Sequence, residues 1–225
     1  MSDRPLLLDL YCCAGGAAMG YHKAGFDVVG VDRKSQPHYP FEFIQADALE
    51  YMRGLMEDGP VWQFQAIHAS PPCQRFSKSV SKANREKHPD LVALTRDLLV
   101  DSGLPYVIEN VPRAPLVNPV QLCGTTLGLR GLQRHRIFET NFPLWSPGCA
   151  HGVNEPRFAP AWNRKNPLRV RPISGGWTDD NEHEANKQAM GVDWDVTPTE
   201  LSEAIPPAYT EFIGSQLLER MELLA

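Results

Sequence analysis

Short apolar runs alternate with amphipathic segments through the first two thirds of the chain. The apolar runs that we expect to form β-strands are Leu6–Leu10, Val28–Val31, Phe43–Gln45, Ala66–Ala69 and Tyr106–Glu109. The helix-compatible segments among them are Ala17–Ala24, Ala48–Met56 and Leu91–Val100. Continuous apolar strands separated by helices are typical of a parallel sheet covered on both faces. The pattern therefore predicts an α/β fold.

The periodicity disappears from Asn141 to Glu184, where Pro, Gly, Trp, Asn and Arg are frequent. Such a segment indicates an irregular insertion that carries recognition rather than core. Helical patterns return at Glu184–Met190, Thr199–Ala204 and Ala208–Leu224. We expect a core over residues 1–140, a small insertion over 141–184, and C-terminal helices over 185–225 that complete the core.

The composition of the 225 residues, 42% hydrophobic and 22% charged, is that of a globular protein with one substantial core. The apolar runs are too short to cross a bilayer, and the N-terminus lacks the pattern of a secretion signal. We therefore expect a cytoplasmic protein without membrane contact. Five cysteines in such a chain do not predict a disulfide framework. Cys149 and His151 are two candidate metal ligands, fewer than the usual four, so we expect no metal.

The net charge of −5 argues against nonspecific binding to polyanions, but positive charge is concentrated in two stretches. The first contains Arg75, Lys78, Lys82, Arg85 and Lys87, and the second contains Arg157, Arg164, Lys165, Arg169 and Arg171. Both could follow a nucleic-acid backbone. A solvated loop face is the alternative that charge alone leaves open.

Glycines and acidic residues follow the first three predicted strands. The first strand runs into Cys12-Cys13-Ala14-Gly15-Gly16, a turn of the kind that lets backbone amides and a helix N-terminus approach a ligand. Asp32 ends the second strand, about 20 residues further on, where an acidic side chain commonly bonds ribose hydroxyls. Asp47 follows the third strand. Since ligands bind at the carboxyl ends of such strands, this pattern predicts a nucleotide-like cofactor.

The fourth strand runs into Ser70-Pro71-Pro72-Cys73-Gln74. The two prolines stiffen the chain and fix the direction of the cysteine. A lone cysteine is commonly a small buried hydrophobic residue, but its position after a strand and the positive charge beyond it favour a thiolate. We therefore predict that Cys73 is a nucleophile.

Two further segments carry candidate chemistry. The fifth strand ends in Glu109-Asn110, and a partly buried carboxyl group can donate a proton to a ring nitrogen. An ordinary strand-end carboxylate is the alternative. A later predicted strand, Arg134–Phe138, places Arg134 and Arg136 on one side, where they could bind phosphate and base oxygens or simply form an exposed face.

Together these segments resemble the cytosine C5-methyltransferase family. Asp9-Leu10-Tyr11 with Gly15-Gly16 is similar to its cofactor loop, and Asp32 and Asp47 are similar to its ribose and adenine contacts. Pro71-Pro72-Cys73-Gln74 resembles the nucleophile loop, Glu109-Asn110-Val111 the base-contacting motif, and Arg134-x-Arg136 the paired-arginine motif. The motifs occur in the family's order over most of the chain.

The resemblance implies a Rossmann-like, S-adenosylmethionine-dependent methyltransferase fold with a short target-recognition insertion. It implies a monomer that methylates C5 of a flipped cytosine in DNA, as in restriction-modification, with Cys73 bonding C6 and Glu109 contacting N3. The implied catalytic residues are Cys73, Glu109, Arg134 and Arg136. The implied cofactor residues are Asp9, Tyr11, Cys12, Cys13, Gly15, Gly16, Asp32, Arg33, Asp47, Ala48, Pro71 and Pro72. The implied nucleic-acid contacts are Gln74, Arg75, Ser77, Lys78, Arg164, Arg169 and Arg171.

The chain departs from the family pattern at three places. Cys13 stands where the family usually has glycine, and Leu132 stands where it has glutamine, with Gln133 displaced by one. Ala204-Ile205-Pro206-Pro207 resembles the closing motif, but Ser202-Glu203 replaces its preceding Gly-Asn. The insertion is also much shorter than the usual target-recognition domain.

Three alternatives stay open: an RNA cytosine methyltransferase, a noncatalytic binding protein on the same fold, and a donor closely related to S-adenosylmethionine. The presence of both Cys73 and Glu109 argues against the noncatalytic protein, which has no chemical need for the pair. Amino-group methyltransferases need no thiolate, and Ser70-Pro71-Pro72-Cys73 does not fit their pattern.

Overall fold

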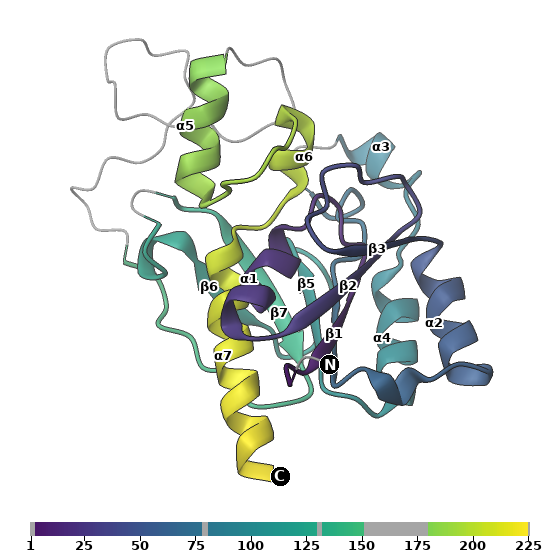
Figure 1. Cartoon of the computed structure of the whole chain (residues 1–225). Helices are drawn as coiled ribbons and strands as arrows, with labels where there is room; N and C mark the ends of the chain where they lie inside the picture. The colour runs from purple at the N-terminus through teal and green to yellow at the C-terminus, as the bar shows by residue number, and fades with distance from the viewer. Residues whose placement is uncertain (1–2, 78–80, 130–131, 151–179, 225) are drawn as a thin grey trace.

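The strands of the chain form one mixed sheet in the order β3-β2-β1-β4-β5-β7-β6 (Figure 1). The structure is a computed structural model that describes residues 3–77, 81–129, 132–150 and 180–224. Within these ranges the strands are β1 (Leu6–Leu10), β2 (Asp27–Asp32), β3 (Glu42–Gln45), β4 (Ala66–Ala69), β5 (Tyr106–Asn110), β6 (Val120–Cys123) and β7 (His135–Thr140). All of the strands predicted from the pattern are present, and β6 is an addition.

Helices cover both faces of the sheet, as the alternation of buried residues along β1 shows. Leu7 packs in one core cluster with Tyr21 and Tyr209, whereas Leu8 packs in another with Met52 and Leu99. The first cluster lies under α1 (Gly16–Ala24) and α7 (Pro207–Leu224), and the second under α2 (Ala48–Glu57) and α4 (Val92–Ser102). The shorter elements are α3 (Lys82–Arg85), α5 (Asp180–Met190), α6 (Pro198–Glu203), and the 3₁₀ helices η1 (Val61–Gln63) and η2 (Gly124–Thr126).

The expectation of a parallel sheet holds for β1 to β5 but is wrong for β7. This strand runs antiparallel to both of its neighbours, β5 and β6. β6 ends at Cys123 and β7 begins at His135, which leaves too little chain for a parallel crossover of a dozen or more residues that includes a helix. The carboxyl ends of β1, β2, β4 and β5 nevertheless share one edge of the sheet.

The predicted insertion lies largely outside the described residues, so the division into three segments stays a prediction. At its C-terminal side, helix α5 begins at Asp180, before the predicted start at Glu184. Among the described residues, every helix is too short or too polar to span a bilayer.

Helices α1 and α7 are in very close contact, and this contact joins the two ends of the chain. The Thr210 hydroxyl in α7 donates a hydrogen bond of 2.8 Å to the carbonyl of Ala17 in α1. Gly20 makes the approach possible, because a Cβ atom there would overlap the Thr210 hydroxyl and the Pro207 carbonyl. At the start of α1, a Cβ atom on Gly16 would likewise overlap the carbonyl of Ile205.

We predict that Gly20→Ala lowers the free energy of unfolding by about 1–3 kcal/mol or more, as expected for an added methyl group in a tightly packed contact. Gly54→Ala is the matched control, because Gly54 lies in helix α2 with open space around it. We expect that variant to gain about 0.5–1 kcal/mol from helix propensity. Urea denaturation measures the free energy of unfolding of both variants. Equal free energies for Gly20→Ala and Gly54→Ala would show that α1 and α7 can move apart without cost.

Candidate active site

The predicted catalytic side chains meet at the ends of three neighbouring strands. Cys73 follows β4, Glu109 lies near the end of β5, and Arg136 lies near the start of β7. Arg136 Nε is 2.9 Å from Glu109 Oε1, and both side chains are largely buried. The Cys73 thiol is close enough to both groups, and to Arg134, for their charges to change its pKa. The fold therefore brings all four predicted catalytic residues into one site.

The charges in this site set the protonation of the thiol and the carboxyl. Burial raises the pKa of Glu109, while Arg136, a hydrogen bond from Ser70, and Arg134 act in the opposite direction. Burial also raises the pKa of Cys73, and the negative charge of Glu109 raises it further, against the two arginines. A proton on Glu109 therefore favours the Cys73 thiolate, because it removes the repelling charge.

The loop that carries Cys73 is fastened to the strand that carries Glu109. The Asn110 side-chain amide donates a hydrogen bond of 2.9 Å to the Pro71 carbonyl. Behind the nucleophile, the amides of Phe76 and Ser77 each donate to the Cys73 carbonyl at 2.9 Å. Asn110, which is fully buried, thus connects the proline turn to the base-contacting motif.

Arg134 has a different position from the one that its paired motif suggests. It donates hydrogen bonds to the carbonyls of Ser202 at 2.7 Å and Ala204 at 3.0 Å, and its own carbonyl accepts from the Tyr209 hydroxyl. Burial lowers the pKa of Arg134 to about 9. Its side chain therefore holds the closing motif before α7 in place, beside the other catalytic candidates.

Three hydrogen-bonded residues behind Glu109, the buried Tyr21 and His68 and the half-buried Ser70, are absent from the sequence prediction. The Tyr21 hydroxyl lies 3.0 Å from His68 Nδ1, and His68 Nε2 lies 2.9 Å from the Ser70 hydroxyl, which bonds Glu109. Burial lowers the pKa of His68 to about 3, so the imidazole is neutral. One signal for these contacts was available in the sequence: a histidine within the apolar run of β4. A buried polar side chain needs hydrogen-bond partners.

The loop after β1 adopts strained backbone conformations beside Asp32. Tyr11, Cys13 and Gly15 have φ values of 60°, 45° and 89°. A left-handed conformation at Cys13 explains why glycine suits this position, and the cost for a side chain is about 1–2 kcal/mol. The Cys13 amide donates to Asp32 Oδ2 at 3.3 Å, and the Lys34 amide donates to Oδ1 at 2.9 Å. Asp32 therefore holds the ends of β1 and β2 together.

The other predicted cofactor residues differ in exposure. Asp9 is fully enclosed, and burial raises its pKa well above the ordinary value of a carboxyl group. Asp47 and Arg33 are exposed, and Asp47 Oδ1 caps α2 by accepting from the amides of Leu49 at 3.0 Å and Glu50 at 3.2 Å. The residues that are buried in the loops are Cys12, Gly15, Gly16, Ala48 and Pro71, whereas Tyr11, Cys13 and Pro72 are half-buried.

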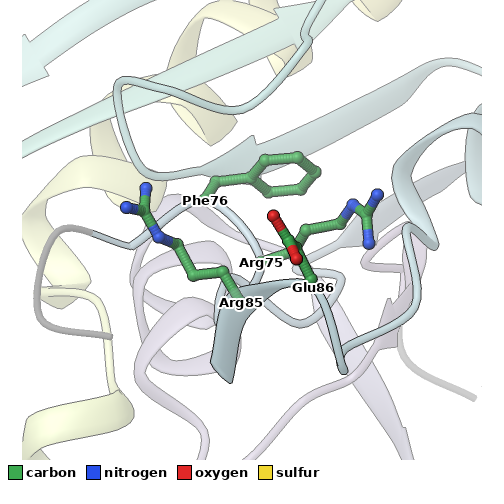
Figure 2. Close-up of a pocket in the computed structure, with 4 residues that line it drawn as sticks. All are labelled: Arg75, Phe76, Arg85 and Glu86. Carbon is green, nitrogen blue, oxygen red and sulfur yellow. The ribbon is translucent and has the colours of Figure 1, made fainter. Parts of the chain in front are cut away.

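The predicted nucleic-acid contacts are described only in part. Arg75, Phe76, Arg85 and Glu86 line a pocket of about 320 Å³ beyond the nucleophile. Figure 2 shows the two guanidinium groups on opposite sides of this pocket, with Phe76 and Glu86 between them. Gln74 and Ser77 are half-buried nearby. Lys78, Arg164, Arg169 and Arg171 lie outside the described residues.

Comparison with solved structures identifies a shared fold. The Entamoeba histolytica methyltransferase EhMeth aligns over 98% of this chain and 99% of its own, with 12% identity and a TM-score of 0.59. The Schizosaccharomyces pombe Dnmt2 methyltransferase aligns over 97% and 99%, with 15% identity and a TM-score of 0.59. The chain spans 45% of a proposed DNA modification methyltransferase from an Escherichia coli prophage, over 60% of its own length, with 20% identity and a TM-score of 0.45. No protein-family model and no curated protein matches the sequence.

These comparisons confirm the predicted fold class. The chain has the Rossmann-like fold of these methyltransferases over nearly its whole length. Identities of 12–15% do not by themselves assign a reaction, so the site chemistry must carry the functional argument.

We predict that Glu109→Gln makes the Cys73 thiol more reactive, because the substitution removes the negative charge that raises its pKa. The rate of iodoacetamide alkylation at Cys73, read by peptide mass spectrometry across a pH series, should reach half-maximum at a lower pH than in the wild type. Asp58→Asn is the matched control, because it makes the same change of charge at an exposed residue at the end of α2. An unchanged or higher midpoint at Cys73 would show that the two groups are not coupled.

Proposed function

We propose that this protein is a DNA cytosine C5-methyltransferase, which transfers a methyl group from S-adenosylmethionine to C5 of a flipped cytosine. The observation that carries the proposal is that the Cys73 thiol lies close enough to the Glu109 carboxyl for its charge to raise the thiol pKa, with Arg136 in contact with Glu109. The shared methyltransferase fold supports the same conclusion.

The chemistry of cytosine requires this pair of groups, because C5 of the aromatic ring is a poor nucleophile. Addition of the Cys73 thiolate to C6 breaks the aromaticity and moves electron density toward C5 and N3. Glu109, whose pKa burial raises, holds a proton at N3 and so stabilises the charge that develops there. After C5 has taken the methyl group, its proton is lost to solvent, the C–H electron pair returns to the ring, and expulsion of the Cys73 thiolate from C6 restores aromaticity.

The residues around the β1 loop fit S-adenosylmethionine. A left-handed turn at Gly15, followed by the N-terminus of α1, leaves backbone amides near the end of β1. Asp32, which is mostly buried beside this turn, offers a hydrogen-bond acceptor for the ribose. Asp47, which is exposed just after β3, offers an acceptor for the adenine. When bound, S-adenosylmethionine supplies an activated methyl group for C5.

The loop beyond Cys73 provides a surface suited to a polyanion. Arg75 and Arg85 supply positive charge, and Phe76 supplies an aromatic face between them (Figure 2). A stacked base hides C6, so the target must leave the duplex before Cys73 can attack it. Cations and an aromatic ring next to the nucleophile favour a substrate with both phosphates and an extruded base.

An RNA cytosine methyltransferase is the second candidate, since thiolate addition serves either polymer. We expect tritium transfer from labelled S-adenosylmethionine to duplex DNA to be faster than to transfer RNA, and Cys73→Ser to abolish both. With DNA that contains 5-fluorocytosine, the wild type should form a stable covalent complex. Fluorine replaces the C5 proton that must leave before Cys73 is expelled, so the adduct is trapped. Cys73→Ser should form no such complex. Turnover by Cys73→Ser would remove the nucleophile, and a faster rate on transfer RNA would assign the enzyme to RNA.

We predict that Asp32→Ala weakens S-adenosylmethionine binding by about 10- to 100-fold, the loss expected for hydrogen bonds to a charged group. Calorimetric titration measures the dissociation constant. Asp58→Ala is the control with the same change of charge, because Asp58 is exposed at the far end of α2. Equal affinities of the two variants would move the ribose contact away from Asp32.

A further inference from the structure

Three potential metal ligands converge where β6, the edge strand of the sheet, pairs with β7. Cys123 ends β6 and His135 begins β7, and the two residues are direct partners in the antiparallel ladder. Cys149 comes back from the chain beyond β7, so that its Sγ lies 3.3 Å from His135 Nε2. The ligand atoms of all three side chains lie within 4.8 Å of one another.

Hydrogen bonds outside the cluster hold Cys149 in this position. The Ser146 hydroxyl donates to the Gln121 carbonyl at 2.7 Å, and the Thr126 hydroxyl donates to the Gly148 carbonyl at 2.8 Å. Gly148 has a φ of 74°, a left-handed turn that directs the chain toward Cys149. The convergence of the three ligands therefore follows from the local fold and not from contacts among the ligands alone.

We propose that Cys123, His135 and Cys149 bind a zinc ion. Two thiolates and one imidazole form a donor set that suits zinc, whose bonds are about 2.3 Å to sulfur and about 2.0–2.1 Å to nitrogen. Tetrahedral geometry then places neighbouring ligand atoms about 3.5–3.8 Å apart, within reach of the present spacing after small side-chain rotations. The fourth position is taken by a water molecule or another donor.

The surroundings of the two sulfur atoms suit thiolates that bind a cation. Thr125 Oγ1 lies 3.2 Å from Cys123 Sγ and accepts a hydrogen bond of 3.1 Å from the Ala150 amide, which leaves its own proton for the sulfur. The Gln121 side-chain amide donates to Cys149 Sγ at 3.8 Å. Such second contacts commonly orient and stabilise metal ligands.

The zinc ion joins β6, β7 and the chain at Cys149, which lies within the predicted insertion over 141–184. Along β7 the side chains alternate, so His135 lies on the face opposite Arg136. We assign the ion a structural role from its position: it fixes the edge of the sheet on one face, while Arg136 contacts Glu109 on the other. The inference does not depend on the proposed methyl transfer.

Metal analysis of the full chain tests the proposal. The protein is expressed with zinc in the medium, purified under reducing conditions through a tag without histidines, and assayed by plasma mass spectrometry. We expect about one zinc ion per chain, and replacement of the zinc by Co²⁺ should give thiolate charge-transfer bands and the visible bands of a tetrahedral site. Cys149→Ser and His135→Asn should each lose most of the metal. The exposed position of Cys149 makes its variant the safer one for folding.

Cys73→Ser is the matched control for the loss of a cysteine, and it should retain the full zinc content. Circular dichroism checks that each variant is folded. Three results overturn the proposal: a wild type that takes up neither zinc nor Co²⁺, full retention of zinc in both cluster variants, or a metal-free protein in which peptide mapping finds Cys123 joined to Cys149 by a disulfide.

Discussion

The ion pair between Glu109 and Arg136 is the contact on which the proposed site depends. A carboxylate buried at the end of β5 is costly unless an opposite charge accompanies it, and Arg136 provides that charge at 2.9 Å. Since Arg136 belongs to the antiparallel strand β7, the reversal of strand direction at this point is what brings the cation to the carboxyl. The same two charges then act in opposite directions on the Cys73 thiol.

Two further sets of hydrogen bonds hold the rest of the site around this ion pair. Asn110 holds the proline turn before Cys73 against β5, and Arg134 holds the segment before α7. Because α7 packs on α1 through Gly20, the segment from Ser202 to Ile205 also lies against the start of α1, where the cofactor loop ends. The nucleophile loop, the base-contacting strand and the cofactor loop are thus connected through backbone hydrogen bonds and close helix packing.

Most of the fold and the placement of Cys73 beside Glu109 could be predicted from the sequence, because they depend on local patterns. The apolar runs of β1, β2, β4 and β5 are almost entirely buried strands. Cys73, just after β4, and Glu109, near the end of β5, share an edge of the sheet because these two parallel strands end there. β6 could not be predicted, because only Leu122 and Cys123 of its four residues are buried and Gln121 interrupts the apolar run. The role of Arg134 and the convergence of Cys123, His135 and Cys149 depend on contacts between remote segments, which no periodicity encodes.

Tyr21, His68 and Ser70 form a hydrogen-bonded chain of side chains that ends at Glu109 and therefore responds to the protonation of this carboxyl group. A neutral imidazole has one donor and one acceptor nitrogen, so the chain has a polarity. When Glu109 is ionised, Ser70 donates to it, and His68 carries its hydrogen on Nε2 and accepts from Tyr21. When Glu109 carries the proton and donates to Ser70, the polarity reverses and the hydrogen resides on Nδ1. The tautomer of a histidine in the core is thereby coupled to the protonation state of the Glu109 carboxyl.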